Sequence, residues 1–316
     1  MRKALLAVAA AVVLAIAAVT YTLQARGSDE VTTERLTLVP GQLFVRDQAS
    51  GHIAAVPLND PGAPRRLGEL KCDRFAVAQQ TAVCLSVQPG TLPPVTDMLV
   101  LNADLTVRHR ESLPGTPSRA RVSPDGRLVN WTLFVTGDSY AATGFSTRSG
   151  VYDIAHEQLF KSIEELPVFV SGQRYFASDV NYWGITFAPD GNRFYATLGS
   201  KGRTYLVEAD YGRYRGKAVR ENVECPSLSP DGTRVAFKKK VAEGEWRLSV
   251  LDLASSRETE LAETRSVDDQ ALWQDGSTIL YGLGGDIWSV PSDGTGSPKR
   301  LLTGGSSPAV TLQTIS

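Results

Sequence analysis

The sequence predicts an all-β protein built from repeated strand–turn–strand units, and three observations support this. First, a Ser-Pro-Asp-Gly turn flanked by apolar strands recurs along the chain, most clearly over residues 225–237. Second, further copies occupy residues 120–129 and 185–195, and a degraded copy occupies residues 271–281. Third, the aspartates of the four copies lie 65, 41 and 44 residues apart. Repeats of about 40–50 residues with several strands each are typical of β-propeller blades.

The chemistry of the repeated turn explains why each copy is expected to be a hairpin. Proline presets its own backbone angle, aspartate can hydrogen-bond its own backbone, and glycine accepts a positive φ. The residues on both sides alternate or run apolar, with β-branched and aromatic types, as strands do. Ordinary hairpins in a β-sandwich are the alternative, and four copies at blade-like spacing disfavour it.

The hairpins and the strands between them divide the chain into six predicted blades of four antiparallel strands. Residues 42–70 form the first blade, and residues 268–302 form the sixth. Residues 306–314 remain as one extra strand, and pairing it into the first blade would close the ring and remove the free edges. Residues 36–38 are the alternative for the innermost strand of that blade. A seventh blade built from residues 132–182 is the alternative.

The N-terminus carries a segment unlike the rest of the chain. Arg2 and Lys3 precede an uncharged run over residues 4–23, which is just long enough to span a bilayer. We therefore predict a signal peptide or a signal-anchor transmembrane helix over residues 1–25, a linker over 26–35 and the propeller over 36–316. The poor cleavage site around Ala25 slightly favours the anchor. Both alternatives place the propeller outside the cytoplasm, either secreted or anchored to the membrane.

Three cysteines bear on the redox environment. Cys72 and Cys84 flank one predicted hairpin, so they can form a disulfide in an exported chain. Cys225 would then be left over at the start of an innermost strand, where we expect it to be buried. No histidine lies near it in the sequence, so we assign it no catalytic role.

Several functions lack the residues they need. A net charge of −1 offers no basic field for nucleic acid. His52, His109 and His156 are scattered and have no metal-binding spacing. No Gly-x-Ser-x-Gly elbow and no phosphate-binding glycine loop is present. We therefore expect no cofactor, no metal site and no catalytic residue.

One constellation emerges when the blades are aligned on the turn. The residues six or seven positions before each turn aspartate begin an innermost strand, so they should converge at one mouth of the channel. The resulting candidate ligand-binding residues are Arg119, Trp183, Glu224, Asp268 and Asp269, together with Gln270, which follows Asp269. They fit a small polar or cationic ligand, or a cation held by carboxylate oxygens. The alternative is an ordinary solvated mouth without a ligand.

A second group lies between the outer strands of the fourth predicted blade. Tyr205, Tyr211 and Tyr214 occur among arginines, and both residue types are enriched in protein interfaces. The arginines are Arg203, Arg213 and Arg215. The group fits either a protein contact or an exposed loop.

Residues 228–237 and 248–253 resemble the WD40-like repeats of TolB-type propellers, and residues 181–187 and 224–232 are similar to exported TolB-like proteins of actinobacteria. The resemblance covers about residues 40–310. It implies a non-catalytic interaction or sensing module of the cell envelope, monomeric, with another envelope protein as its partner. The α/β domain of TolB has no counterpart in this sequence, because residues 36–70 already form a blade, so its lipoprotein partner is not carried over. The alternative is a ligand- or cation-binding propeller, or an enzyme, with its site at the channel mouth.

Overall fold

The computed structural model describes Leu14, residues 32–135 and residues 146–311. The chain divides into two units, residues 1–33 and residues 34–316. The described part of the first unit is Leu14, which is helical, together with Thr32 and Thr33. None of the helical residues that can be described forms a stretch long and apolar enough to cross a membrane. The predicted signal peptide or anchor, apart from Leu14, and most of the predicted linker lie outside the described residues.

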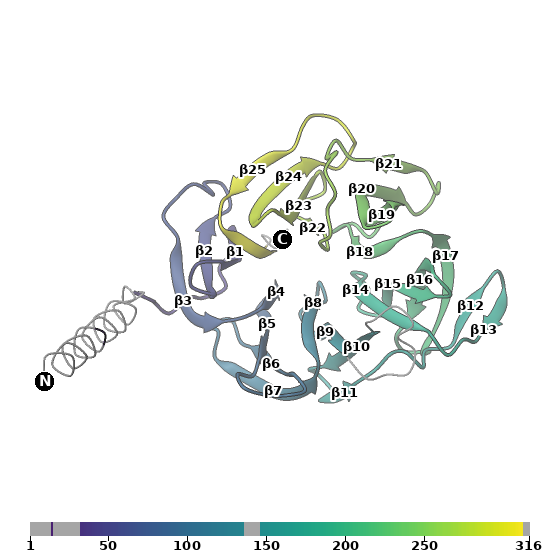
Figure 1. Ribbon diagram of the computed structural model, residues 1–316, viewed down its shortest axis with the longest axis horizontal. Helices are drawn as coiled ribbons and strands as arrows, with labels where there is room; N and C mark the ends of the chain where they lie inside the picture. The colour runs from purple at the N-terminus through teal and green to yellow at the C-terminus, as the bar shows by residue number, and fades with distance from the viewer. Residues whose placement is uncertain (1–13, 15–31, 136–145, 312–316) are drawn as a thin grey trace, which may run out of the picture. The chain divides into compact units, whose positions relative to one another are not determined.

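The second unit is a ring of six sheets around a central channel (Figure 1). Each of the first three blades has four strands, which are named below from the channel outwards. Blade one contains β26 (Gly305–Val310), β1 (Gln42–Asp47), β2 (His52–Pro57) and β3 (Arg66–Lys71). Blade two contains β4 (Arg74–Ala78), β5 (Thr81–Val87), β6 (Val95–Leu101) and β7 (Val107–Pro114). Blade three contains β8 (Thr116–Val122), β9 (Leu128–Val135), β10 (Ser146–Asp153) and β11 (Gln158–Phe160).

Blades four to six complete the ring. Blade four contains β14 (Asn181–Phe187), β15 (Arg193–Ser200), β16 (Arg203–Asp210), β17 (Arg215–Glu221), β12 (Val168–Val170) and β13 (Gln173–Tyr175). Blade five contains β18 (Glu224–Leu228), β19 (Arg234–Ala242), β20 (Glu245–Asp252) and β21 (Glu258–Glu260). Blade six contains β22 (Leu272–Trp273), β23 (Thr278–Leu283), β24 (Asp286–Pro291) and β25 (Lys299–Leu302).

The predicted six-bladed propeller is confirmed, with one correction to the blades. Blade four has six strands instead of four, because the β12–β13 hairpin joins its outer edge. Val168 of β12 pairs in parallel with Gly216 of β17, and the hairpin lies on the rim of the ring (Figure 1). The alternative of a seventh blade from residues 132–182 is therefore wrong. Those residues finish blade three and extend blade four.

The chain closes the ring by pairing its last described strand with its first. Strand β26 runs antiparallel to β1, with Leu43 opposite Val310 and Phe44 opposite Ala309. This is the closure that the sequence predicts. Leu36, just before β1, is buried and is not part of an innermost strand.

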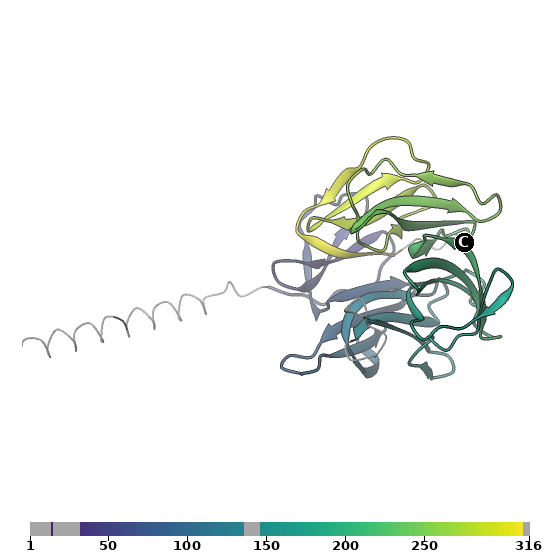
Figure 2. The ribbon, with the colours of Figure 1, turned by 45° about the vertical axis from the view of Figure 1, so that its right-hand side comes forward.

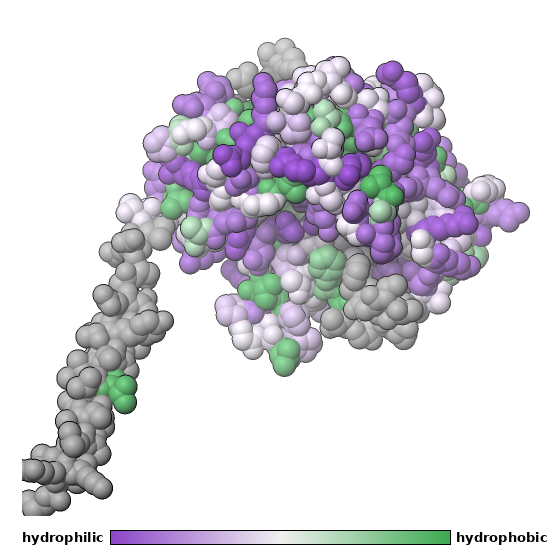
Figure 3. All heavy atoms as spheres, turned by 45° about the horizontal axis from the view of Figure 1, so that its top comes forward, coloured by the Kyte–Doolittle hydropathy of each residue, from purple (hydrophilic) through white to green (hydrophobic). Residues whose placement is uncertain are grey.

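The core lies between neighbouring blades. Leu85 of blade two packs in one cluster with Trp131 of blade three, and Leu43 of blade one packs with Leu280 of blade six. Each large apolar side chain buried in this way contributes about 1.5–3 kcal/mol. Figures 2 and 3 show the ring from two further directions, and in Figure 3 hydrophilic residues cover most of the visible face. Hydrophobic burial between blades therefore holds the ring together.

The repeated turn has the geometry that its residues predict. In blade three the N–H of Gly126 donates to the carbonyl of Ser123 at 2.8 Å, and the N–H of Arg127 donates to Oδ1 of Asp125 at 3.1 Å. Gly126 has a φ of 75°, a conformation that costs most other residues free energy. The turn at residues 229–233 has the same two bonds. The aspartates therefore stabilise their own turns.

The structure joins Cys72, just past β3, to Cys84 of β5 by a disulfide, and leaves Cys225 as a free, buried cysteine. The bond is the pairing that the sequence allows. It ties the connection between blades one and two to the second strand of blade two.

Thiol titration tests this pairing. We expect one reactive thiol per chain in denatured, unreduced protein, and three after reduction. In the native protein Cys225 should not react, because only 2% of the residue is exposed. Three thiols in unreduced, denatured protein would contradict the pairing.

Ring closure can be tested with Ala309→Asp. Ala309 is 3% exposed and packs in the cluster that contains Phe44 and Phe75. A carboxylate there would lose most of its hydration within an apolar cluster, so we expect the free energy of unfolding to fall by about 2–4 kcal/mol. Lys299→Asp, on the exposed outer strand of blade six, should change it by less than about 0.5 kcal/mol. Equal urea midpoints for the two variants would show that closure through β26 is unimportant.

Candidate functional site

The innermost strands bring five of the six predicted residues together around the channel. Arg119 lies in the middle of β8 in blade three, and Glu224 begins β18 in blade five. Asp268, Asp269 and Gln270 lie just before β22 in blade six. These residues are far apart in the sequence, and the innermost strands of three blades bring them to the same part of the ring.

Trp183 is the exception. Its ring packs directly on Gly199 of β15, where a side chain would not fit. A Cβ atom built on this glycine would lie 2.5 Å from Cζ3 of Trp183. With Glu224, Trp183 lines a separate groove of about 810 Å³ between blades four and five. It therefore borders the candidate site without joining the charged group in the channel.

A lysine that the alignment did not predict lies at the centre of the charged group. Lys238, on β19, has a side chain that is only 4% exposed, and its Nζ donates to Oδ1 of Asp268. Nζ also lies 3.9 Å from Oε2 of Glu224 and 4.6 Å from the centre of the Trp246 ring. Burial works to lower the pKa of Lys238, but the neighbouring Cys225 and Asp268 outweigh it and raise the pKa. Lys238 is therefore a fixed cation.

The carboxylates of the group already have partners. Asp268 accepts from Lys238, Glu224 Oε1 accepts from Nε1 of Trp246 at 3.1 Å, and Asp269 Oδ2 accepts from the N–H of Gly282 at 3.0 Å. Within the described part of the chain, no group of three histidine, cysteine or acidic residues is placed to hold a metal ion. The arrangement therefore resembles an internal ion-pair network more than a cation site.

Two arginines of β8 reach across the channel from blade three to blade six, which lies opposite in the ring (Figure 1). Nη2 of Arg119 lies 4.0 Å from Oδ1 of Asp268 and donates to the carbonyl of the same residue at 3.4 Å. Nη2 of Arg121 donates to the carbonyl of Ala271 at 2.5 Å. Together they narrow the channel, and a small cavity of about 30 Å³ lies between Arg74, Arg119 and Arg121.

Arg121 and its neighbour Arg74 differ from Arg119 in having no ion-pair partner. Among the described residues neither lies within 4 Å of a carboxylate oxygen, and the nearby Asp269 acts on both only at longer range. Burial lowers the pKa of Arg121 to about 10 and also lowers the pKa of Arg74. Burial also works to lower the pKa of Arg119. This effect is smaller than the opposing effect of the neighbouring Cys225, Asp269 and Asp268, so the pKa of Arg119 is raised. Arg74 and Arg121 therefore carry positive charges that no carboxylate of the described residues balances at ion-pair distance.

A larger cavity in the channel, which Arg121 also lines, lies towards the Ser-Pro-Asp-Gly turns. We call it the turn-side chamber. It has a volume of about 360 Å³ and is lined by all six innermost strands, with Pro124, Pro189 and Pro230 of the turns at its mouth. Its other walls include Val122, Phe187, Leu228, Leu272, Trp273 and Val310, and Arg121 lines it as well as the small cavity. It is therefore an apolar space with an arginine at its inner end.

Sequence reasoning placed the candidate site at the opposite mouth, where the strands begin, and did not predict the chamber. One signal was available. The residue four positions before the turn aspartate is uncharged in three copies, as Thr186, Ser227 and Ala271, but is Arg121 in the fourth. Arg121 is therefore the feature of the sequence that distinguishes the turn of blade three from the other copies at this position.

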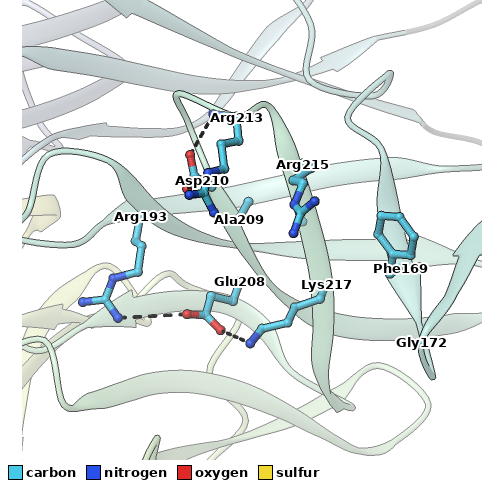
Figure 4. Close-up of a pocket in the computed structure, with 10 residues that line it drawn as sticks. Phe169, Gly172, Arg193, Glu208, Ala209, Asp210, Arg213, Arg215 and Lys217 are labelled. Atoms are coloured by element: carbon cyan, nitrogen blue, oxygen red, sulfur yellow. Dashed lines mark hydrogen bonds and ion pairs between the residues drawn. The ribbon is translucent and has the colours of Figure 1, made fainter.

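The predicted tyrosine and arginine group is split by the structure. Tyr205 is buried, and the rings of Tyr211 and Tyr214 contact Phe160, so the tyrosines belong to the packing of blade four. Arg213 and Arg215 instead line an open groove of about 570 Å³ beside the β12–β13 hairpin (Figure 4). We call it the blade-four groove.

Four cations and two carboxylates face the blade-four groove. Glu208 lies 4.0 Å from Arg193 and 3.1 Å from Lys217, and Asp210 lies 3.9 Å from Arg213 (Figure 4). Arg215 is exposed and forms no ion pair with a described residue. Arg193 is also paired with Asp190 at 2.7 Å, so the groove and this neighbour together carry a small net positive charge.

The ion pair between Asp268 and Lys238 gives a testable pH dependence. Burial works to raise the pKa of Asp268, but Lys238, Arg119 and Arg74 outweigh it and lower the pKa. A carboxyl whose pKa is lowered by folding adds stability above its unfolded pKa of about 3.9 and loses it as the pH falls through the folded value. The free energy of unfolding should therefore fall more steeply between about pH 5 and pH 2 in the wild-type protein than in Asp268→Asn.

The size of this effect is limited because 64% of the Asp268 side chain is exposed. Screening by solvent should keep the loss in Asp268→Asn at pH 7 to about 1 kcal/mol or less. Urea unfolding at several pH values measures it, with Asp60→Asn in an exposed loop as the matched control. Parallel pH curves for wild type and Asp268→Asn would show that this ion pair does not contribute to stability.

Known proteins resemble the chain in fold but not in sequence. No family model and no curated protein matches it. TolB from Acinetobacter baumannii matches with a TM-score of 0.54 and 16% identity, over 86% of this chain and 67% of that one. A TolB-type protein from Agrobacterium tumefaciens matches with a TM-score of 0.50 and 12% identity, over 86% and 92%.

An enzyme shares the same likeness. Oligogalacturonate lyase from Vibrio parahaemolyticus matches with a TM-score of 0.51 and 13% identity, over 82% of this chain and 73% of that one. At such identities the likeness shows the fold alone and does not decide between binding and catalysis. The chain thus has the six-bladed fold of TolB-like propellers, as the sequence resemblance implies.

Proposed function

We propose that this propeller is a non-catalytic recognition module outside the cytoplasm, where it binds another protein of the cell envelope. Its TolB-like fold supports the proposal, as does the disulfide between Cys72 and Cys84, because such bonds persist in oxidising compartments. The uncharged run over residues 4–23 after two basic residues supports export. The same run would hold the propeller at the membrane if it is not cleaved.

The blade-four groove is the observation on which the interaction proposal rests. The β12–β13 hairpin adds two strands to blade four only, and the groove lies beside it. Phe169 lines the groove, and Phe176, just past the hairpin, is 71% exposed with Arg174 over its ring. Exposed aromatic and arginine side chains are enriched where proteins bind one another.

The charges of the groove indicate the kind of partner. Its four cations outnumber its two carboxylates, and Arg215 has no ion pair among the described residues. An acidic segment of a partner would complement this surface and would be steered towards it electrostatically. We therefore propose an envelope protein that presents an acidic segment.

A second candidate function is ligand binding in the channel. Arg74 and Arg121 favour it, because they are guanidinium groups without a carboxylate within ion-pair distance. A site for a cation is less well supported than one for an anion, since the channel carboxylates already accept hydrogen bonds from the protein.

Charge reversal in the blade-four groove tests the interaction proposal. We expect Arg213→Glu with Arg215→Glu to weaken capture of the envelope partner about tenfold or more, because two attractive charges become repulsive. The measurement is quantitative affinity capture from an envelope extract at two salt concentrations. Capture by the wild-type protein should also weaken as salt screens the groove.

A matched control makes the same change of charge elsewhere. Lys299→Glu with Arg300→Glu reverses two exposed cations on β25 of blade six. This variant should capture the partner as well as the wild-type protein does. If the groove variant and the control capture the same proteins in equal amounts, the blade-four groove is not the binding surface.

A further inference from the structure

We propose that the turn-side chamber is a binding site for a monocarboxylate with an apolar body, whose carboxylate meets Arg121 while its body fills the chamber. The inference deepens the second candidate function, ligand binding in the channel. It does not depend on the blade-four groove or on an envelope partner.

The first support is the shape of the chamber. Its volume of about 360 Å³ lies in the range of about 300–1,000 Å³ that small-molecule sites occupy. Walls come from all six blades, so a ligand would be enclosed by the whole ring. The interior end is narrowed by Arg119 and Arg121 reaching to blade six. The space is therefore a pocket that narrows towards its inner end.

The second support is the character of the walls. Phe187, Leu228 and Trp273 are apolar, and most of the remaining walls are alanine, valine, proline and leucine, with Gln79, Ser227 and Ser229 as further polar lining residues. The Ser229 hydroxyl already donates to Oδ1 of Asp231 at 2.5 Å. The indole N–H of Trp273 is already bonded to the carbonyl of Ser227 at 2.8 Å. The walls therefore offer little to a sugar or another ligand with many hydroxyl groups, and they suit a hydrocarbon or aromatic body.

The third support is the state of Arg121. Its one hydrogen bond goes to the carbonyl of Ala271, and it has no ion pair among the described residues. The guanidinium group has five N–H donors, so most of them are left for a ligand. Burial disfavours its charge, which an arriving anion would stabilise. A carboxylate can accept two parallel hydrogen bonds from a guanidinium group.

Thr186 offers a further donor at the chamber wall. Its Oγ1 accepts the N–H of Leu228 at 3.2 Å, and the described residues provide no acceptor for its own hydroxyl hydrogen. A monoanion is favoured over a more highly charged ligand, because only Arg121 among the chamber's lining residues is charged. The site therefore combines one cation, a hydroxyl donor and apolar walls.

Three probes separate these features by calorimetry on the full chain. Octanoate carries both the head and the body, octanamide carries the same body without the charge, and acetate carries the head without the body. We expect octanoate to bind at one site per chain, and octanamide and acetate to bind at least about tenfold more weakly.

Variants then locate the binding. Arg121→Gln should weaken octanoate binding by about 10- to 100-fold and leave octanamide unchanged, because it removes a charge-assisted contact. Arg213→Gln, in the blade-four groove, is the matched control and should bind octanoate as the wild-type protein does. Leu272→Trp, which narrows the chamber but keeps Arg121, should weaken both octanoate and octanamide, and it serves if Arg121→Gln does not fold.

Three results would overturn the inference. The first is that octanoate does not bind at concentrations up to about 10 mM. The second is that octanoate and octanamide bind equally well. The third is that folded Arg121→Gln binds octanoate as the wild-type protein does. Failure of octanoate to bind leaves capture of an envelope partner unaffected, because that depends on the blade-four groove. Loss of capture in the groove variant likewise says nothing about octanoate.

Discussion

Pairing of β26 with β1 is the interaction on which the rest of the molecule depends. An open row of blades would leave the inner edge of β1 without partners for its backbone, and unpaired edges invite association with other chains. Because Leu43 meets Val310 and Phe44 meets Ala309, blade one is completed by the far end of the chain. Only a closed ring places blade six opposite blade three, and every contact across the channel depends on that geometry.

The repeated turn contributes to the same closure in a second way. Its backbone carbonyls also accept hydrogen bonds from side chains of the preceding blade. Blade two bonds the turn of blade three, blade three bonds the turn of blade four, and blade five bonds the turn of blade six. The bonds are Thr81 Oγ1 to the Gly126 carbonyl at 2.9 Å, Arg127 Nη2 to the Gly191 carbonyl at 2.6 Å, and Arg234 Nη2 to the Gly276 carbonyl at 2.5 Å. The turns thus link successive blades around the mouth of the turn-side chamber.

The sequence predicts the blades and their closure because both follow from local patterns of strand, turn and spacing. It does not predict the attachment of β12 to β17, since three-residue strands carry almost no periodic signal. The alignment also predicts that Arg119, Glu224 and Asp268 meet, but it cannot detect Lys238, which lies on a second strand and reaches the group through its long side chain. The sequence also does not show which end of the channel holds the larger cavity, because the size of a cavity depends on how side chains from six blades pack.

Arg119 and Arg121 show why convergence of charges is a poor guide to a binding site. Two residues apart on β8, they point to the same side of the strand and towards the same opposing blade. Blade six offers Arg119 the carboxylate of Asp268, but it offers Arg121 only the carbonyl of Ala271. The first cation has a carboxylate at ion-pair distance, which it shares with Lys238, and it links blade three to blade six. The second remains uncompensated beside an apolar space, so the residue without a partner, and not the most crowded cluster, is where an external anion gains most by binding.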